Sequence, residues 1–471
     1  MHSKKWFSAL ALSLFAVLLI GCGGGATISS NSTSPQSGMV FVTGTDAPLQ
    51  SVLSFQVDIT GLSVSDGTNP PVSVLNNPQT VDFARLNGLH TLLDLNTIPA
   101  GTYTSATVTL ANPQIGYLNV PNPQTNPPTR PTITTLNSQS NPPVTLSQSS
   151  ITINLAQPLV VQANDIIGLG FEFNLRKSIQ VDANNQITGI VNPAISLKTI
   201  TPSDADAYID EFIAGVVSVN VAGNSFVIQG PRGRQFTVNV NGQTEWEGND
   251  TINSLTTSSV VQVSGTLDRT SAAILADSVC VVSQDKFFAG GLVTFVDPPT
   301  NTATDFDLFV GNVVPSGTGF QSGQISTINL TGNENFFIYW WHNRISNMLF
   351  NSALMVPGQH VSIGGPFVNG TVTVKRVVLR HEGHTGTWVV GSTNVGAGTF
   401  QFNSNGLAGI LFNGPVTVYT TPFTHWRGGL NSLADLSGSS PLKLRVVGLV
   451  LKDPVSSQPV FVARGVEELS N

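Results

Sequence analysis

The chain of 471 residues is 40% hydrophobic and only 10% charged, with 20 basic and 27 acidic residues. An ordinary soluble domain carries about 25% charged residues, so this composition is typical of an exported β-rich protein and not of a cytosolic enzyme. Neither sign of charge forms a long run. Because nucleic-acid binding requires a clustered basic surface, we expect no nucleic-acid partner. At roughly 100–200 residues per domain, the chain should contain three or four domains.

The N-terminus indicates export. Lys4 and Lys5 precede an uncharged stretch over residues 6–20. This stretch suits a signal peptide, and it is too short to span a bilayer, which takes about 20 helical residues. It ends in Leu19-Ile20-Gly21-Cys22, which resembles the lipobox of bacterial lipoproteins.

The lipobox resemblance implies that residues 1–21 are a lipoprotein signal peptide that is removed. Cys22 then becomes the first residue and carries acyl chains that hold the protein in the membrane. We therefore expect a lipid-anchored protein of the cell envelope, in the outer membrane where the host has one. Residues 22–37, rich in Gly, Ser, Thr and Asn, are expected to form a flexible tether.

Past the tether, apolar residues alternate with polar ones in many short segments, which predicts an all-β protein. Examples are Phe55, Val57 and Ile59, and later Phe236, Val238 and Val240. One short helix is expected over residues 203–213. Ser203 could cap it, acidic residues fill its first turn, and apolar residues recur four apart.

Residues 38–200 are expected to form the first domain. Its opening, Val40-Phe41-Val42-Thr43-Gly44-Thr45-Asp46-Ala47-Pro48, resembles the first strand of DUF family 4382, a family without an assigned activity. Later stretches fit the same family, including Val81-Asp82-Phe83-Ala84-Arg85-Leu86. The resemblance implies a β-sandwich of immunoglobulin or transthyretin type. Residues 121–145, rich in Pro, Asn, Thr and Ser, are predicted to form a long exposed loop.

The rest of the chain shows internal repetition. Three units share a Gly-led first strand, an aromatic position near the middle and a closing apolar strand, over residues 212–283, 287–380 and 385–470. The middle unit is degenerate and carries an insertion. The pattern resembles DUF family 5666, which implies three small β-barrel-like units. We expect them to be joined by exposed connections at 201–211, 284–287 and 381–386.

His381 and His384 form the sharpest candidate for a metal site, together with Glu382. Zincin-type sites need histidines four apart on a helix, whereas here the spacing is three and Gly383 lies between them. Zinc would also need a further protein ligand, which His342, His360 or His425 could supply only by folding back. We therefore expect a solvated connection, with no metal and no cofactor, and leave metal binding as the alternative.

Acidic residues are sparse but locally grouped, as at Asp305 and Asp307 and at Asp204, Asp206 and Asp210. The first pair should lie on a polar outer strand face, and the second group should complement a helix dipole. The chain contains no nucleophile elbow, Walker loop or dinucleotide fingerprint. We therefore expect no enzymatic activity and no catalytic residue, and keep a metal-dependent or acid-based hydrolase as a remote alternative.

The tryptophans and the second cysteine have structural and functional interpretations. Trp246, Trp340, Trp341 and Trp426 occupy one repeat position, and Trp388 opens the third unit. We expect Trp246 and Trp426 to pack in the barrel cores, since strand alternation turns them away from their charged neighbours. One of Trp340 and Trp341 could be exposed, because adjacent strand residues face opposite ways. Cys280 lies in an apolar run and is expected in the core.

Two functions remain open after these arguments. The first is a non-catalytic, structural or interaction role for a protein anchored in the cell envelope, with other envelope proteins as possible partners. The second is a surface glycan- or polymer-binding module that uses exposed tryptophans, with a polysaccharide as the partner. The sequence favours the first.

Overall fold

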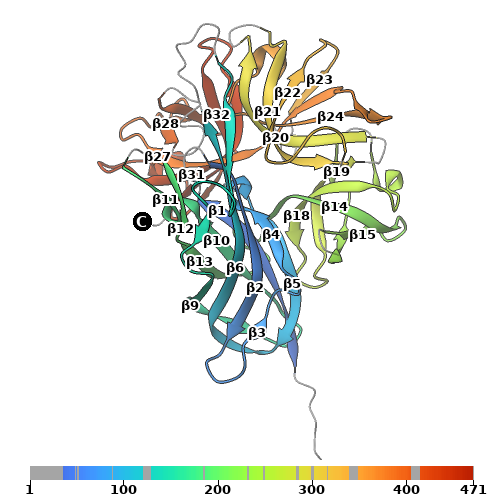
Figure 1. The fold of residues 1–471 in the computed structure, drawn as a ribbon, viewed down its shortest axis with the longest axis vertical. Helices are drawn as coiled ribbons and strands as arrows, with labels where there is room; N and C mark the ends of the chain where they lie inside the picture. Colours follow the sequence, from blue (N-terminus) through green and yellow to red (C-terminus); the bar gives the residue numbers. More distant parts are fainter. Residues whose placement is uncertain are drawn as a thin grey trace, which may run out of the picture. The chain divides into compact units, whose positions relative to one another are not determined.

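The computed structural model describes residues 36–47, 49, 52–86, 89–119, 129–183, 186–230, 233–247, 250–282, 286–298, 302–315, 317–338, 348–404 and 414–469. The regular secondary structure of these residues is almost entirely β-strand (Figure 1), which confirms the all-β prediction. Within these ranges the α-helical residues are those of α1 (Leu175–Ser178). No helix of the described part is long and apolar enough to cross a membrane.

The N-terminal segment forms a sandwich of two main sheets. The first sheet contains, in spatial order, β13 (Ile195–Ile200), β10 (Ile166–Asn174), β1 (Ser37–Ala47) and β5 (Thr91–Pro99). The second contains β3 (Val72–Ser73), β2 (Val52–Ser65), β6 (Gly101–Asn119) and β7 (Thr132–Leu136), with β4 (Gln79–Asp82) beside β2 and β9 (Ser150–Val161) beside β6. A small third sheet contains β11 (Ile179–Val181), β12 (Ile187–Val191) and β8 (Thr145–Leu146).

The core of the sandwich lies between the two main sheets and is rich in phenylalanine. Phe55 of β2 and Phe173 of β10 bring their ring centroids within 5.0 Å. Phe83, from the 3-10 turn η1 (Phe83–Leu86), stacks 5.4 Å from Phe171 and lies 5.1 Å from Phe173. All four rings are fully buried, and aromatic burial of this kind contributes strongly to a core. The turn η1 is therefore held firmly against the sandwich.

The predicted loop over residues 121–145 is wrong at residues 132–136 and at its last residue, which lie in strands, while residues 137–144 form no strand. Residues 132–136 form β7, which pairs antiparallel with β6, and residues 145–146 form β8, which pairs with β12. The β-branched residues Thr132, Ile133 and Thr134 suit a strand, and their pairing partner lies within the same sheet. Residues 121–128 lie outside the described residues.

The first repeat forms one sheet whose strands close on themselves. In spatial order they are β16 (Gln235–Asn239), β15 (Ser225–Gln229), β14 (Ile209–Asn220), β18 (Val260–Leu267), β19 (Ile274–Val282) and β17 (Glu245–Trp246). Because β16 also pairs with β19, five strands form a closed ring of pairings. Closure removes free sheet edges.

The third repeat has the same order and the same closing pair. Its strands are β29 (Val416–Tyr419), β28 (Thr399–Ser404), β27 (Glu382–Trp388), β31 (Lys443–Lys452), β32 (Pro459–Glu468) and β30 (His425–Arg427). Here β29 also pairs with β32. The short strands β17 and β30 each run parallel to the last strand of their unit. Trp246 and Trp426 therefore occupy equivalent places.

The second repeat keeps the central order but not the closing pair between described strands. Its strands are β22 (Ile325–Asn329), β21 (Asp305–Val314), β20 (Lys286–Asp297), β24 (His360–Val368), β26 (Arg376–Leu379) and β23 (Asn335–Ile338), with β25 (Thr371–Val372) beside β24. A 3-10 turn precedes the fourth strand of each ordered list: η4 (Ile252–Ser254), η6 (Ser352–Leu354) and η7 (Leu433–Asp435). This shared turn extends the repetition seen in the sequence.

The helix predicted over residues 203–213 is wrong. A 3-10 turn, η2 (Ala205–Ala207), is followed directly by β14. The four-residue apolar spacing is overridden by tertiary pairing, because Ile209 and Phe212 pair with β18 across a bulge. The backbone N–H of Asp210 also donates to the His90 carbonyl at 2.7 Å. The strand thus gains partners from two other parts of the chain.

Candidate functional site

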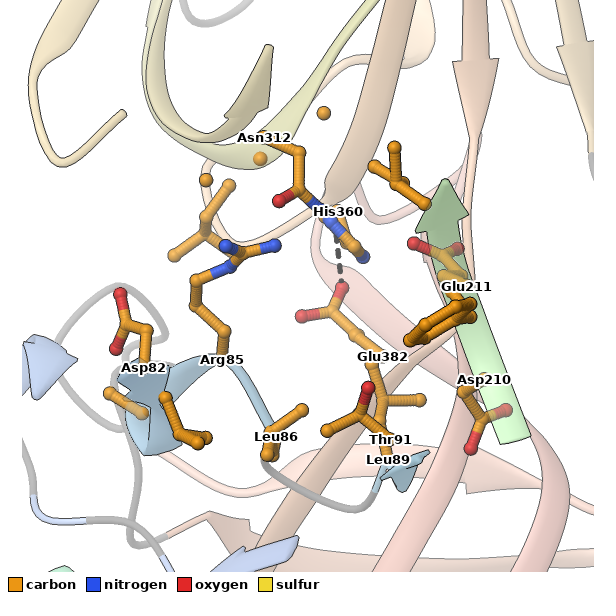
Figure 2. A pocket seen from close by; sticks show the side chains of 18 of the residues that line it. Asp82, Arg85, Leu86, Leu89, Thr91, Asp210, Glu211, Asn312, His360 and Glu382 are labelled. Atoms are coloured by element: carbon orange, nitrogen blue, oxygen red, sulfur yellow. Dashed lines mark hydrogen bonds between the residues drawn. The ribbon is translucent and has the colours of Figure 1, made fainter. Parts of the chain in front are cut away.

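A cavity of about 590 Å³ is lined by residues of the sandwich and of all three repeats (Figure 2). Ligand sites in proteins commonly have volumes of roughly 300–1,000 Å³ and carry a few polar groups on a mostly apolar wall. The apolar wall includes Leu86, Leu89, Leu92, Phe212, Leu292 and Phe309. The polar side chains include Asp82, Arg85, Asp210, Glu211, Asn312, His360, Glu382 and His384.

Arg85 projects from η1, the turn that Phe83 anchors in the sandwich core. Its guanidinium lies against Gly311 of β21, where an added Cβ would come within 3.0 Å of Arg85 Nε. Glycine at 311 therefore leaves the space that this side chain occupies. Among the described residues, none forms an ion pair with the guanidinium or accepts a hydrogen bond from it. Burial lowers the pKa of Arg85, opposed by the charges of Asp82 and Glu211, and the group remains protonated.

Asp82 lies three residues before Arg85, but its carboxylate accepts hydrogen bonds from groups of the sandwich. Its Oδ2 accepts a hydrogen bond from Ser54 Oγ at 2.7 Å, and its Oδ1 accepts one from the backbone N–H of Phe55 at 2.8 Å. Burial raises the pKa of the Asp82 carboxyl, and the charge of Arg85 opposes this shift. The carboxylate therefore fixes the end of β4 rather than neutralising Arg85 by contact.

Glu211 enters the cavity from the bulge in β14, between Ile209 and Phe212. Its φ of 49° lies in the left-handed region, which costs a residue with a long side chain roughly 1–2 kcal/mol. The backbone N–H of Glu211 donates to Ser264 Oγ at 2.9 Å, which holds this conformation. Its carboxylate has no ion-pair or hydrogen-bond partner among the described residues. Strain of this kind clusters at functional sites.

Glu382 of β27 is the opposite case, since both of its oxygens are occupied. Oε1 accepts a hydrogen bond from the backbone N–H of His360 at 3.1 Å, and Oε2 lies 2.9 Å from Nε2 of His384. In the view of Figure 2, Arg85 and Glu211 lie on either side of Glu382. His360 Nδ1 lies 3.0 Å from the carbonyl oxygen of His381. This cluster holds the third repeat against β24 of the second.

Asp210, next to Glu211, is likewise engaged. Its Oδ2 accepts a hydrogen bond from the backbone N–H of His90 at 3.0 Å, and Oδ1 lies 3.8 Å from Arg464 Nη1. Burial raises the pKa of Asp210, and the charges of Arg464 and His90 oppose this shift. The sandwich, the first repeat and the third repeat meet at this carboxylate.

The cavity therefore holds two opposite charges that the described residues leave without contact partners, Arg85 and Glu211. They interact over a distance, since the charge of Glu211 opposes the lowering of the Arg85 pKa by burial, yet no atoms of the two form an ion pair. Both side chains are half-buried, and a charge that is partly removed from water without a partner is costly. The arrangement suits a ligand that brings a complementary charge to each group.

The His381 to His384 segment is not the solvated connection that the sequence predicts. His381, Glu382 and His384 are 4%, 7% and 5% exposed, and β27 starts at Glu382. The segment is buried because only two residues separate β27 from β26 of the second repeat, and β27 pairs at once with β31. His342 lies outside the described residues, and His425 is exposed on β30. No group of three or more potential metal ligands is assembled among the described residues.

Asp305 and Asp307 are not on a polar outer face. Asp307 is 2% exposed, and its Oδ1 lies 2.7 Å from Nη1 of Arg130, which also binds Asp305. Arg130 belongs to the first domain, so its guanidinium joins that domain to two acidic side chains on a strand of the second repeat. Asp206 pairs with His90 at 3.5 Å and with Lys198 at 3.0 Å. These acidic residues link parts of the chain, and Asp204 accepts a local hydrogen bond from the Thr201 N–H.

The tryptophans that the structure describes pack against cores. Trp388 is 1% exposed, while Trp246 and Trp426 are partly buried against the cores of the first and third repeats. Trp340, Trp341 and the lipidation candidate Cys22 lie outside the described residues. Cys280 is buried as predicted, and burial, with the nearby Glu247 charge, raises the pKa of its thiol to about 12.

Arg85 and Glu211 are the site residues that the sequence analysis missed. Arg85 lies inside the stretch 81–86 that carries part of the family resemblance, and Glu211 was assigned to a helix. The rarity of charge is a signal that points to them. Only 10% of the residues are charged, so a charged residue within a strand-rich segment is a candidate for a structural contact or a binding site. Their convergence depends on the packing of distant segments.

Comparison with known proteins supports the assignment of the N-terminal domain. No match was found among curated proteins. The N-terminal part, residues 37–190, matches the model of the family described as "Domain of unknown function (DUF4382)", as its resemblance predicts.

Proposed function

We propose that this protein is a lipid-anchored cell-envelope protein with a non-catalytic role, in which the cavity between the sandwich and the repeats binds a small ligand. The single observation that carries the proposal is the cavity of about 590 Å³ with Arg85 and Glu211 on its wall. The lipobox sequence at Cys22 supports the anchoring. The three repeats, whose sequence pattern resembles DUF family 5666, would complete the cavity.

Contacts between the sandwich and the repeats, and between the repeats, favour a preformed cavity. Nη2 of Arg380 in the second repeat lies 3.0 Å from Oε2 of Glu247 in the first repeat. Nε2 of Gln359, also in the second repeat, donates a hydrogen bond to the carbonyl oxygen of Val450 in the third repeat at 3.1 Å. Arg234 of the first repeat lies 3.4 Å from Asp94 of the sandwich. A preformed site binds more tightly because less ordering is needed on binding.

The glycan-binding alternative is not the one we propose. It requires exposed tryptophan faces, and Trp246, Trp388 and Trp426 all pack against hydrophobic cores. The binding role is tested by thermal unfolding of the chain that begins after Cys22, against a library of small polar and amphiphilic molecules. A ligand at 100 times its Kd stabilises the protein by about 2.7 kcal/mol. If no class of molecule raises the midpoint, the binding role is wrong.

The anchoring is tested separately with Cys22→Ala in the full-length chain. We expect the variant to remain unprocessed or to leave the membrane fraction, because stable anchoring takes more than one acyl chain. A variant that is processed normally and stays with the membrane through a high-salt wash would contradict the lipid anchor.

A further inference from the structure

We propose that the cavity binds a zwitterion of the amino-acid or short-peptide class, with its carboxylate on Arg85 and its ammonium group on Glu211. This inference rests on the proposed binding function and names the ligand class. It follows from which charges on the cavity wall already have partners and which do not.

The other carboxylates on the wall are already occupied. Asp82 accepts two hydrogen bonds from the sandwich, and Glu382 is bonded to His384 and to the His360 N–H. Asp210 is engaged by His90 and Arg464. Glu211 is thus the acidic side chain of the wall that has no partner among the described residues. It is therefore the group available to a cation.

Arg85 is the matching group for an anion. Its guanidinium presents several N–H donors in a planar fork, which suits a carboxylate bound by two parallel hydrogen bonds. No acceptor among the described residues uses these donors. A purely anionic ligand would satisfy Arg85 but would meet the negative charges of Glu211 and Glu382. A ligand with both signs satisfies Arg85 and Glu211 together.

The remainder of the wall specifies an apolar body. Leu86, Leu89 and Leu92 come from the sandwich, Phe212 from the first repeat, and Leu292 and Phe309 from the second. An apolar amino acid or a short apolar peptide with free ends combines this surface with the two charges. Removal of apolar surface from water favours association, so the apolar side chains of the ligand add affinity beyond the charges.

Two features of the backbone support a binding role for Arg85 and Glu211. Gly311 lies where any Cβ would crowd Arg85 Nε at 3.0 Å. Glu211 keeps a left-handed backbone at φ 49°, where a residue such as Asn or Gly would be less strained. The absence of a side chain at Gly311 makes room for Arg85, and the strained backbone at Glu211 places its carboxylate on the cavity wall.

The test is a calorimetric titration of the soluble chain, starting after Cys22, with leucine, leucyl-leucine and leucyl-leucyl-leucine. Matched analogues are N-acetyl-leucyl-leucine, which lacks the cation, and leucyl-leucine amide, which lacks the anion. We expect at least one free-ended ligand to bind and each blocked form to bind about 10- to 100-fold more weakly, as for loss of one charge-assisted pair.

Variants assign each charge to its side chain. Arg85→Met should weaken the free peptide about 10- to 100-fold and leave the amide unchanged, because the amide no longer uses the arginine. Glu211→Gln should do the same for the free peptide and leave the N-acetyl form unchanged. Gly311→Ala should weaken the free peptide several-fold by displacing the guanidinium. The control is Gly215→Ala in β14, where an added Cβ meets nothing within 4 Å.

Three results would overturn the proposal. The first is no binding of any free-ended ligand up to about 10 mM, beyond the millimolar range of weak complexes. The second is equal affinity for free and blocked forms. The third is a loss in Arg85→Met that is the same for free peptide and amide. If the broad ligand library succeeds while this panel fails, the ligand class is wrong and the binding function stands.

Discussion

Two arginines of the N-terminal domain reach the same strand of the second repeat and are treated in opposite ways. Arg130 lies at the start of β21, where Asp305 and Asp307 bind its guanidinium and Asp297 lies 3.6 Å away. Arg85 lies at the other end, against Gly311, without a carboxylate in contact. The first contact is closed by the protein and joins two units. The second is left open and faces a cavity, so similar residues serve assembly at one place and ligand binding at the other.

Removing the contact of Arg130 with Asp305 and Asp307 should have the largest effect on the free energy of unfolding. We expect Arg130→Met to lower the free energy of unfolding by about 2–3 kcal/mol, because it leaves the buried Asp307 carboxylate without its cation. Urea unfolding at pH 7 measures this loss, with Arg176→Met, an exposed arginine of α1, as the control. A loss no greater than that of the control would mean that Arg130 is not a structural contact.

The buried side chain of His381 should make the free energy of unfolding depend on pH. Burial, with Arg464, Arg380 and His360 nearby, lowers the pKa of His381 well below its usual 6.5. The unfolded chain takes up a proton near pH 6.5 and the folded protein does not, so stability falls as pH drops below that value. Between pH 7 and pH 5, the free energy of unfolding of His381→Gln should fall by about 2 kcal/mol less than that of the wild type.

Urea midpoints at the two pH values measure this difference. His425→Gln, at an exposed position on β30, should behave like the wild type. A His381→Gln protein with the full pH dependence would show that another group titrates.

At the open contact, Arg85→Met should change stability by less than about 1 kcal/mol in either direction. The arginine is desolvated without a contact partner, so its removal relieves a cost while it removes little favourable interaction. Urea unfolding beside Arg130→Met gives the comparison directly. Equal losses in the two variants would place Arg85 with the structural contacts.

The smallest effect is expected at the strained residue of the cavity. Glu211→Asn should raise the free energy of unfolding by roughly 0.5 kcal/mol, because Asn adopts the left-handed region more readily. Ser457→Asn is the matched control, since Ser457 has a φ of 58° in an exposed turn. Both should gain similar stability, while Glu211→Asn alone loses ligand. A clear destabilisation of Glu211→Asn would show that its carboxylate supports the fold.

Alternation of apolar residues predicted the fold class, because strand periodicity depends on local sequence. Phe55, Val57 and Ile59 are all fully buried as this pattern requires. The helix predicted over residues 203–213 is wrong, although apolar residues four apart behind N-terminal acidic residues fit a helix locally. The pairing of Phe212 with β18 depends on a segment fifty residues away.

The cavity could not be predicted for the same reason. Arg85 and Gly311 are separated by more than two hundred positions, and no local pattern indicates that they meet. The burial of His381 likewise depends on β31, which joins β27 from far along the chain. Local chemistry shows which residues carry charge, and long-range packing decides which of them remain without partners.

The central claim is tested most directly by the affinity of three proteins for a free-ended apolar peptide: wild type, Arg130→Met and Arg85→Met. Calorimetry should give the same Kd for the wild type and for folded Arg130→Met, despite its lower stability, and a Kd about 10- to 100-fold higher for Arg85→Met. Equal affinities for all three proteins, or a weaker Arg130→Met than Arg85→Met, would contradict the division between a closed structural contact and an open binding site.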